Sequence, residues 1–300
     1  MIDYVRFGEG KGYVSSNPNT RRTLLSKELR FSRNKINVLF GRNGSGKSTV
    51  LSTIAQHCLV RDGFVNKHEF PRLASDDVLR DFVENESEVV STGHPVYYHN
   101  FKSRRRMSSE GFGGLCGGMI NDLHTELAYK YNTGVRSEGE TRMTEIDMVT
   151  HALETHKGMT MRDMVMRTEH YVSPMGVETD MEFDPEDPCH AMIESHFSGL
   201  EDYDKRGVVL LLDEFDENLD LCYTFNLLND YIPKVFVEGC DAQVILTTHN
   251  PIVLSDYIYE SPRFNIISLD GEYTDSCREF LNKIFVPNHG DGEKSKKEDI

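Results

Sequence analysis

The stretch INVLFGRNGSGKST, Ile36 to Thr49, decides the fold of this chain. Its first five residues form an apolar run that predicts a buried strand, and this strand leads directly into a glycine-rich turn. Apolar residues then recur at helical spacing, at Val50, Leu51, Ile54, Ala55 and Cys58. The stretch therefore predicts a strand, a tight turn and a helix in succession, as an α/β fold requires.

The turn has the composition of a phosphate-binding loop. Its glycines, with Lys47 and Ser48, satisfy the pattern G-x-x-x-x-G-K-[ST]. Small residues let successive backbone N–H groups close around a phosphate at the positive end of the following helix. We expect Lys47 to face the β- and γ-phosphates of ATP, and the Ser48 hydroxyl to hold Mg²⁺. The predicted nucleotide-binding residues of this loop are Gly41, Arg42, Asn43, Gly44, Ser45, Gly46, Lys47, Ser48 and Thr49.

Two adjacent carboxylates follow a second apolar run. The segment VVLLLDEFDENLD, Val208 to Asp220, begins as a strand buried on both faces and continues into acids. Open α/β sheets bind their ligands at the carboxyl edge. Asp213 is therefore predicted to order Mg²⁺, and Glu214 to polarise the attacking water as general base. Asp216 and Glu217 instead fit the acidic N-terminus of a helix.

A third apolar strand lies in VILTTHNP, Val244 to Pro251, and ends in polar residues before a proline-initiated helix. Its position after the carboxylates predicts that His249 stands beside the γ-phosphate as a sensor. The predicted catalytic residues are Glu214, His249 and Lys47.

Together these segments resemble an ABC-type ATPase head. In this resemblance Asn218 to Asp220 corresponds to the D-loop, and His249 to the switch histidine. The run TTHNP is similar to the TTHSP of RecF-like, OLD-family and related defence ATPases. The strand pair Ile2 to Gly8 and Leu24 to Phe31 is similar to that of SMC-type heads. The chain thus resembles the non-transporter branch.

The resemblance implies an α/β fold of the P-loop NTPase class. It is an ABC-type head with a mixed central sheet and N-terminal antiparallel strands; the polar, Met-rich and His-rich composition of the middle of the chain predicts an inserted, mainly helical lobe. We expect one head over residues 1–286, the lobe at about 61–206 with a returning strand at Val96 to Tyr98, and a disordered tail over 287–300. The elements expected after the lobe are a helix at Leu219 to Ile232, a strand at Gln243 to Thr247, a helix at Pro251 to Tyr259 and a strand at Phe264 to Leu269.

Such heads complete their site with a signature segment from a second subunit. The stretch Ser137 to Glu140 resembles the S-x-G-E form of this segment, and the glycine-rich run Ser109 to Gly118 is the alternative. The resemblance implies a homodimer through an ATP sandwich, in which Ser137, Gly139 and Asp220 contact nucleotide.

Two positions of the family pattern stay open. No glutamine can occupy the loop after Tyr98, where ABC heads usually place one near Mg²⁺, so His99 and Asn100 are both candidates to replace it. An aromatic ring near the N-terminal strands normally covers adenine, and Tyr13 and Tyr4 are both candidates for that ring.

Charge and hydropathy limit the partners. The formal net charge is −16, so a polyanion would bind only at a local basic patch. Arg21 with Arg22 forms one such patch, and Lys102 with Arg104, Arg105 and Arg106 forms the other. No apolar run approaches the roughly 18 residues of a membrane span, and the first residues lack a signal peptide, so we expect a cytoplasmic protein without a membrane span. The six cysteines are scattered, which argues against a zinc site or a disulfide framework.

The leading hypothesis is a soluble ATPase that hydrolyses Mg-ATP as a nucleotide-switched dimer, in DNA maintenance or repair or in conflict between phage and bacteria. Nucleic acid and an effector protein are both candidate partners. An ATP-gated scaffold for a protein effector and the ATPase subunit of a transporter are the alternatives; the missing glutamine disfavours the transporter. A GTPase is disfavoured because Asn282-Lys283 lacks the aspartate that reads guanine.

Overall fold

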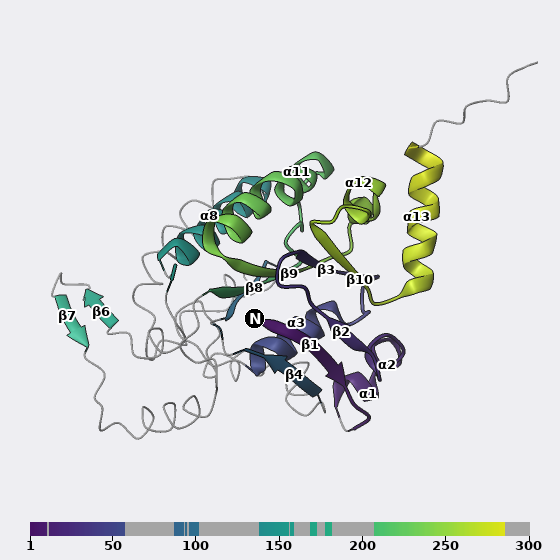
Figure 1. Ribbon diagram of the computed structural model, residues 1–300, viewed down its shortest axis with the longest axis horizontal. Coiled ribbons are helices and arrows are strands. Elements are labelled where there is room, and N and C mark those ends of the chain that lie inside the picture. The colour runs from purple at the N-terminus through teal and green to yellow at the C-terminus, as the bar shows by residue number, and fades with distance from the viewer. Residues whose placement is uncertain are drawn as a thin grey trace, which may run out of the picture.

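The computed structural model describes residues 1–10, 12–57, 87–92, 94, 96–101, 138–155, 157–158, 169–172, 178–181 and 207–285 of the chain. These residues form an α/β fold with one parallel sheet and a smaller antiparallel one (Figure 1).

Five strands form the central sheet, in the order β10-β3-β9-β8-β5. Every neighbouring pair in it is parallel. The three inner strands are buried at every position, which explains why their sequences are mostly apolar. The strands span Ile36–Phe40 (β3), Val96–Asn100 (β5), Val208–Asp213 (β8), Ala242–Thr248 (β9) and Phe264–Ser268 (β10).

Alternate residues of these strands face two separate apolar clusters, as the period of two in a strand requires. Val38 and Phe40 belong to the cluster that includes helix α8 (Glu138–Thr155) and the π-helix η1 (Leu227–Gly239). Leu39 belongs to the cluster that includes helix α3 (Lys47–Gln56) and the small sheet. The parallel sheet is therefore the middle of three layers (Figure 1).

The small sheet has the order β2-β1-β4 and is antiparallel. Its strands span Ile2–Phe7 (β1), Glu28–Arg30 (β2) and Ser87–Ser91 (β4). The mixed central sheet that the resemblance implies differs from the pairing of the described strands, in which antiparallel pairs lie in this separate layer and in a short hairpin. All five described strands of the central sheet are parallel.

The prediction of one strand over Leu24 to Phe31 is wrong in its first part, because Leu24 ends helix α2 (Pro18–Leu24). Proline at the first helical position and an asparagine cap start this helix: Asn17 Oδ1 accepts the N–H of Asn19 at 2.9 Å. A short helix α1 (Tyr13–Ser16) precedes it. The segment between β1 and β2 is thus helical.

The segment after β8 is longer and more irregular than a single helix over Leu219 to Ile232. Helix α11 begins at Leu221 and continues as η1, which contains Pro233 and ends at Gly239. After β9 come the 3₁₀ helix η2 (Pro251–Leu254) and the short helix α12 (Asp256–Tyr259), where one helix was expected. A further helix, α13 (Gly271–Phe285), follows β10 and was not predicted.

The described part of 61–206 contains more strand than expected. Strand β4 belongs to the small sheet and β5 to the central sheet. Strands β6 (Glu169–Val172) and β7 (Glu178–Met181) pair with each other as a hairpin. Helix α8 contributes to the main apolar cluster. Most of this stretch lies outside the described residues, as does 287–300, so the helical lobe and the disordered tail stay predictions.

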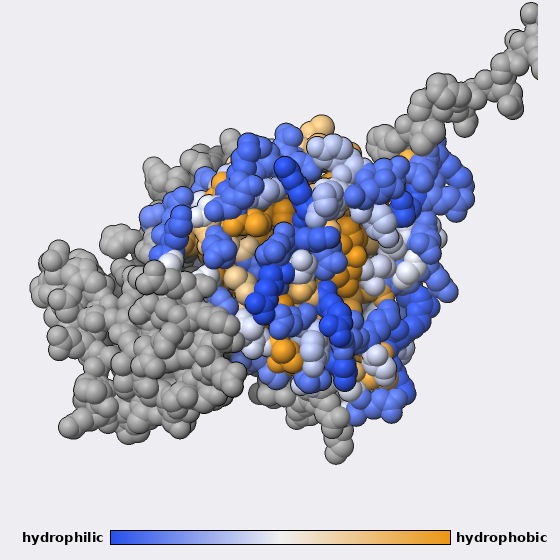
Figure 2. All heavy atoms as spheres, viewed as in Figure 1, coloured by the Kyte–Doolittle hydropathy of each residue, from blue (hydrophilic) through white to orange (hydrophobic). Residues whose placement is uncertain are grey.

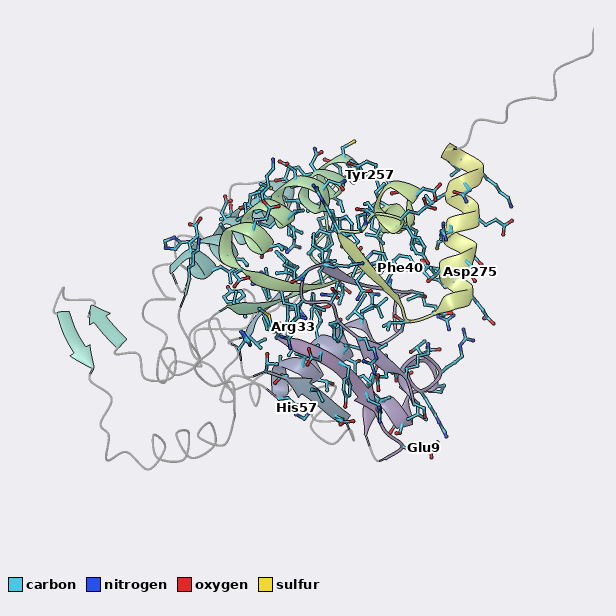
Figure 3. All side chains as sticks on the ribbon, viewed as in Figure 1. Glu9, Arg33, Phe40, His57, Tyr257 and Asp275 are labelled. Carbon is cyan, nitrogen blue, oxygen red and sulfur yellow. The ribbon has the colours of Figure 1, made fainter. Side chains whose placement is uncertain are left out.

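The face shown in Figure 2 is mostly hydrophilic, with apolar side chains in patches between polar ones. Phe40, in contrast, lies in the interior (Figure 3), where its ring stacks on Tyr273 of α13 at 5.7 Å. Helix α13 is therefore packed against the strand that leads into the phosphate-binding loop.

Candidate functional site

The loop between β3 and α3 has the left-handed backbone that its glycines permit. Gly44 has φ 78° and Gly46 has φ 93°, a region that residues with a Cβ rarely adopt. A Cβ on Gly46 would also lie 2.6 Å from Leu24 Cδ1. The loop is thus closely packed, and its backbone continues directly into the first turn of α3.

Helix α2 holds this loop from outside. Thr23 Oγ1 donates to the Ser45 carbonyl at 2.6 Å, and both residues are buried. Sequence reasoning missed this support because it placed a strand from Leu24 to Phe31; Asn17 followed by Pro18 was the pattern that could have revealed the helix.

Lys47 lies in the first turn of α3 and is only 5% exposed. Its Nζ donates to the carbonyls of Gly41 at 2.8 Å and Arg42 at 3.2 Å. The ammonium group is therefore held over the loop, where a phosphate cradled by the loop would meet it.

Asp213 ends β8 and is fully buried beside α3. Its Oδ1 accepts from Ser48 Oγ at 3.1 Å and from Thr247 Oγ1 at 2.6 Å. Burial raises the pKa of Asp213 to about 6, although these two hydrogen bonds and the charge of Lys47 act in the opposite direction. The structure thus brings together Ser48 and Asp213, the two residues predicted from sequence to hold a metal.

Glu214 follows Asp213 and takes a left-handed conformation, with φ 53°. Its N–H donates to Thr247 Oγ1 at 2.8 Å, and its carbonyl accepts the N–H of Glu217 at 3.1 Å. The residue is 8% exposed. Thr247 was not predicted as a site residue, yet its one hydroxyl contacts both members of the acidic pair.

Asn100 is the second site residue that only strand pairing reveals. It lies opposite Asp213 in the β5–β8 register and donates from Nδ2 to Asp213 Oδ2 at 3.1 Å. Its Nδ2 also donates to Tyr98 OH at 3.3 Å. His99 packs edge-on against the ring of Phe101 at 4.4 Å. Of the two candidates to replace the missing glutamine, Asn100 is the one in contact with Asp213.

The interpretation of Asp216 and Glu217 as acids at a helix N-terminus is wrong. Both lie in the turn before α11, whose N-cap is Asp220: its Oδ1 accepts the N–H of Tyr223 at 2.8 Å. Asp216 is buried and accepts from Thr248 Oγ1 at 2.7 Å, and burial raises its pKa. It therefore ties the acidic turn to the end of β9.

His249 follows β9 directly and is exposed, as is Asp220. The N–H of Asn250 donates to Thr248 Oγ1 at 2.8 Å, so the chain beside His249 is fixed to the same threonine that binds Asp216. Both exposed side chains are positioned by ordered loops at the carboxyl edge of the sheet.

Several predicted residues lie outside the described ranges: Ser137, the run Ser109 to Gly118, and the basic patch of Lys102, Arg104, Arg105 and Arg106. Gly139 lies in the first turn of α8. Tyr13 OH accepts from Asn17 at the start of α2, whereas Tyr4 OH donates to Glu88 on the small sheet. Tyr13 is thus the ring on the segment that supports the phosphate-binding loop.

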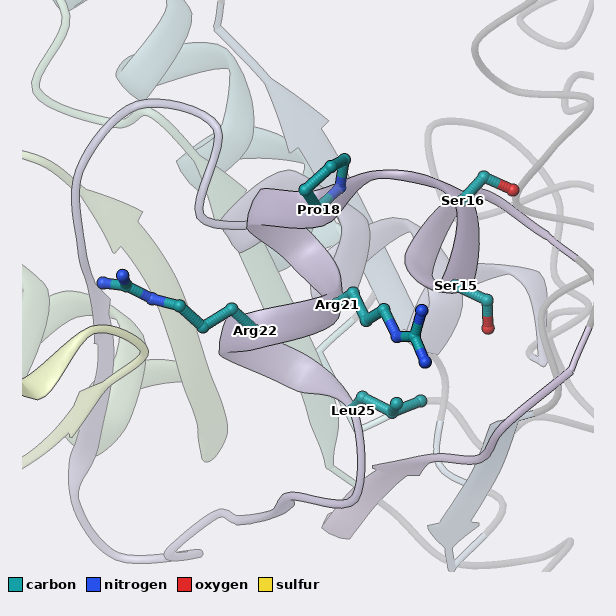
Figure 4. Close-up of a pocket in the computed structure, with 6 residues that line it drawn as sticks. All are labelled: Ser15, Ser16, Pro18, Arg21, Arg22 and Leu25. Carbon is teal, nitrogen blue, oxygen red and sulfur yellow. The ribbon is translucent and has the colours of Figure 1, made fainter.

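The basic patch of Arg21 and Arg22 is divided by α2. The two side chains point to opposite sides of the helix in Figure 4. Arg22 pairs with Asp270 at 3.3 Å, and Arg42 of the loop pairs with the same carboxylate at 3.0 Å. Both arginines also line one cavity, together with Ser15, Ser16, Pro18 and Leu25.

No protein-family model and no curated protein matches the sequence. Two solved structures are similar in part. One, from Pyrococcus furiosus, is described as an ABC transporter ATP-binding protein; it has 14% identity and a TM-score of 0.34, with 90% of this chain and 98% of that chain covered. The other is described as a metal-chelate type ABC transporter in an inward-facing conformation. It has 14% identity and a TM-score of 0.32, with 85% of this chain and 77% of that chain covered. At this level of similarity the function must be argued from the chain's own residues.

Two negative findings concern the described ranges alone. They contain no group of three or more His, Cys, Asp or Glu side chains able to hold a metal ion. None of their helices combines the length and the apolar character needed to cross a bilayer. A divalent cation at Ser48 and Asp213 would therefore need further ligands from outside these ranges, such as the nucleotide phosphates and water that Mg²⁺ binds.

Proposed function

We propose that this chain binds Mg-ATP at the loop Gly41 to Thr49 and hydrolyses it with Glu214. The observation that carries the proposal is the 3.1 Å contact between Ser48 Oγ and Asp213 Oδ1. It brings a hydroxyl near the end of a glycine-rich loop against the carboxylate that ends a buried strand. This is the pair of oxygen ligands that a magnesium ion bound to a nucleotide requires.

The residues present fit the group. The loop backbone is left-handed at Gly44 and Gly46, a conformation that lets successive N–H groups approach a phosphate closely. Ser48 and Asp213 would hold Mg²⁺, with Asn100 beside them. The ion would neutralise charge on the phosphate oxygens. Lys47 would contact the β- and γ-phosphates from its buried position.

Glu214 is proposed as the general base. Its N–H is fixed by Thr247 and its carbonyl by the turn to Glu217, so the direction of its side chain is set by the backbone. A carboxylate at this point would accept a proton from the attacking water. General base catalysis of this kind contributes roughly 10²–10⁴ in rate.

We further propose that the active form is an ABC-type homodimer. His249 and Asp220, both predicted to contact nucleotide, are exposed at one edge of the sheet, where a second copy could close over them. Ser137 and Gly139 of the second copy would complete the site. Glu214→Gln should then accumulate as an ATP-bound dimer in sedimentation, whereas Ser137→Arg should bind ATP as a monomer. A Glu214→Gln protein that stays monomeric with saturating Mg-ATP would remove the sandwich.

Phosphate release by the purified chain tests the function directly. We expect turnover with Mg-ATP and none when EDTA removes the metal. Stimulation by DNA would support a role in DNA maintenance or in conflict between phage and bacteria. Tight ATP binding without turnover, with or without DNA, would favour the ATP-gated scaffold instead.

A further inference from the structure

Arg142 of helix α8 lies where two segments of the proposed site leave the sheet. The side chain is buried, with 4% exposed, in a chain whose arginines are otherwise mostly at the surface in the described ranges. Its Nη1 donates to the Phe101 carbonyl at 3.0 Å, and its Nε donates to the Glu217 carbonyl at 3.0 Å. One guanidinium therefore connects the ends of β5 and β8.

These two carbonyls lie just beyond the last paired residues of the strands. The Phe101 N–H donates to the Asp213 carbonyl at 3.2 Å, which extends the β5–β8 pairing by one residue. The chain after Asp213 then turns away, and Glu217 closes that turn by donating to the Glu214 carbonyl. Arg142 spans the gap that opens between the two segments. It acts as one more cross-link after the ladder ends.

Other contacts fix the guanidinium in this position. Glu145, itself 2% exposed, pairs with Nη1, and the carboxylate of Glu217 lies 3.9 Å from Nη2. The group also lies over the ring of Phe101, with Cζ 4.8 Å from the centroid. An arginine suits this role because its donors form a rigid planar fork, whereas a lysine is a single point charge.

We propose that Arg142 is a positioning residue for ATP hydrolysis, which holds the segment of Asn100 and the turn of Glu214 in fixed relation. The inference rests on the proposed function. The contacts of Arg142 are with Phe101, Glu145 and Glu217, whereas the phosphate-binding loop is held separately by α2 through Thr23. Loss of the guanidinium should therefore reduce kcat and leave ATP affinity nearly unchanged, because small displacements of reacting groups lower rates steeply.

The test compares Arg142→Gln and Arg142→Lys with the wild type in ATP titrations and in steady-state turnover. We expect kcat to fall about 10–100-fold for Arg142→Gln and less for Arg142→Lys, with the Kd for ATP within about threefold of wild type. Arg278→Gln is the matched control, because Arg278 also makes an ion pair and a ring contact, but with Asp256 and Tyr259. It should keep wild-type kcat.

Chemical rescue separates positioning from general loss of structure. Arg142→Ala removes the fork, and guanidinium at millimolar concentration should restore part of kcat while ammonium at the same concentration should not. Wild-type kcat in Arg142→Gln, or equal losses in kcat and in ATP affinity, would overturn the inference and leave the proposed function standing. A wild-type chain that binds ATP and never hydrolyses it would overturn the proposed function and the inference with it.

Discussion

Thr247 on β9 donates its hydroxyl hydrogen to Asp213 on β8, with 2.6 Å between Oγ1 and Oδ1. The same oxygen accepts the N–H of Glu214 at 2.8 Å. A threonine hydroxyl has one donor and two acceptor lone pairs, so it can make both bonds at once. The relative position of the two acidic residues thus depends on the pairing of β8 with β9.

Replacing this hydroxyl by a methyl group should harm both stability and turnover. In Thr247→Val the buried N–H of Glu214 loses its acceptor, which typically costs about 1–3 kcal/mol. We also expect kcat to fall roughly tenfold or more, since the turn that carries Glu214 is released. Thermal unfolding and ATP turnover measure the two effects. Thr247→Ser keeps the hydroxyl and should stay near wild type; equal stability in the two variants would contradict the role given to Thr247.

Lys47→Ala should abolish detectable ATP binding and leave the fold intact. The side chain supplies the principal positive charge of the loop. The loop is also held by hydrogen bonds from Thr23 and within the turn around Ser45, and these do not involve the lysine side chain. Titration with a fluorescent ATP analogue measures the affinity, and circular dichroism checks the fold. Lys234→Ala removes an exposed lysine that pairs with Asp230 along η1, and this variant should bind ATP as the wild type does. Unchanged affinity in Lys47→Ala would exclude the loop as the nucleotide site.

The raised pKa of Asp213 predicts a pH dependence of stability. The pKa is about 6 in the folded chain and 3.8 in an ordinary aspartate, so the folded state holds the proton more tightly. Its contribution to stability is complete below pH 4 and is lost as pH rises through 6. Without Mg²⁺, the free energy of unfolding of the wild type should therefore fall, relative to that of Asp213→Asn, by on the order of 1–3 kcal/mol between pH 4 and pH 7. Urea unfolding of both proteins at each pH measures the difference. A constant difference would contradict the raised pKa, because it would show that folding leaves the pKa of Asp213 unchanged.

Mg²⁺ should offset the loss of stability at higher pH, because the ion binds the ionised carboxylate of Asp213. Adding Mg-ATP at pH 7 should raise the midpoint of unfolding in wild type and raise it less in Asp213→Asn. Equal shifts in both proteins would mean that Asp213 does not hold the metal.

The strands that carry the site were predictable because both faces of each are buried. Continuous apolar residues in β3, β8 and β9 leave few alternatives to a central strand, and the glycines and Lys47 restrict the turn between β3 and α3. The order of these strands brings Ser48 close to Asp213, as expected from parallel strands that share a carboxyl edge.

Residues that act through strand pairing were harder to predict. Thr247 looks like any polar residue at a strand end, and Asn100 was one of two candidates until its register opposite Asp213 was known. Helix α2 was missed because Leu24 also fits an alternating strand. Arg142 stands in a polar helix whose sequence does not show that its guanidinium is buried.

Turnover of Glu214→Gln at saturating Mg-ATP tests the central claim most directly. The substitution keeps the size of the side chain, and the backbone contacts with Thr247 and Glu217 remain. It removes only the group proposed to accept the proton of the attacking water. We predict that ATP still binds with near wild-type affinity and that kcat falls by roughly 10²–10⁴. A Glu214→Gln protein that hydrolyses ATP at the wild-type rate would contradict the assignment of Glu214 as the base.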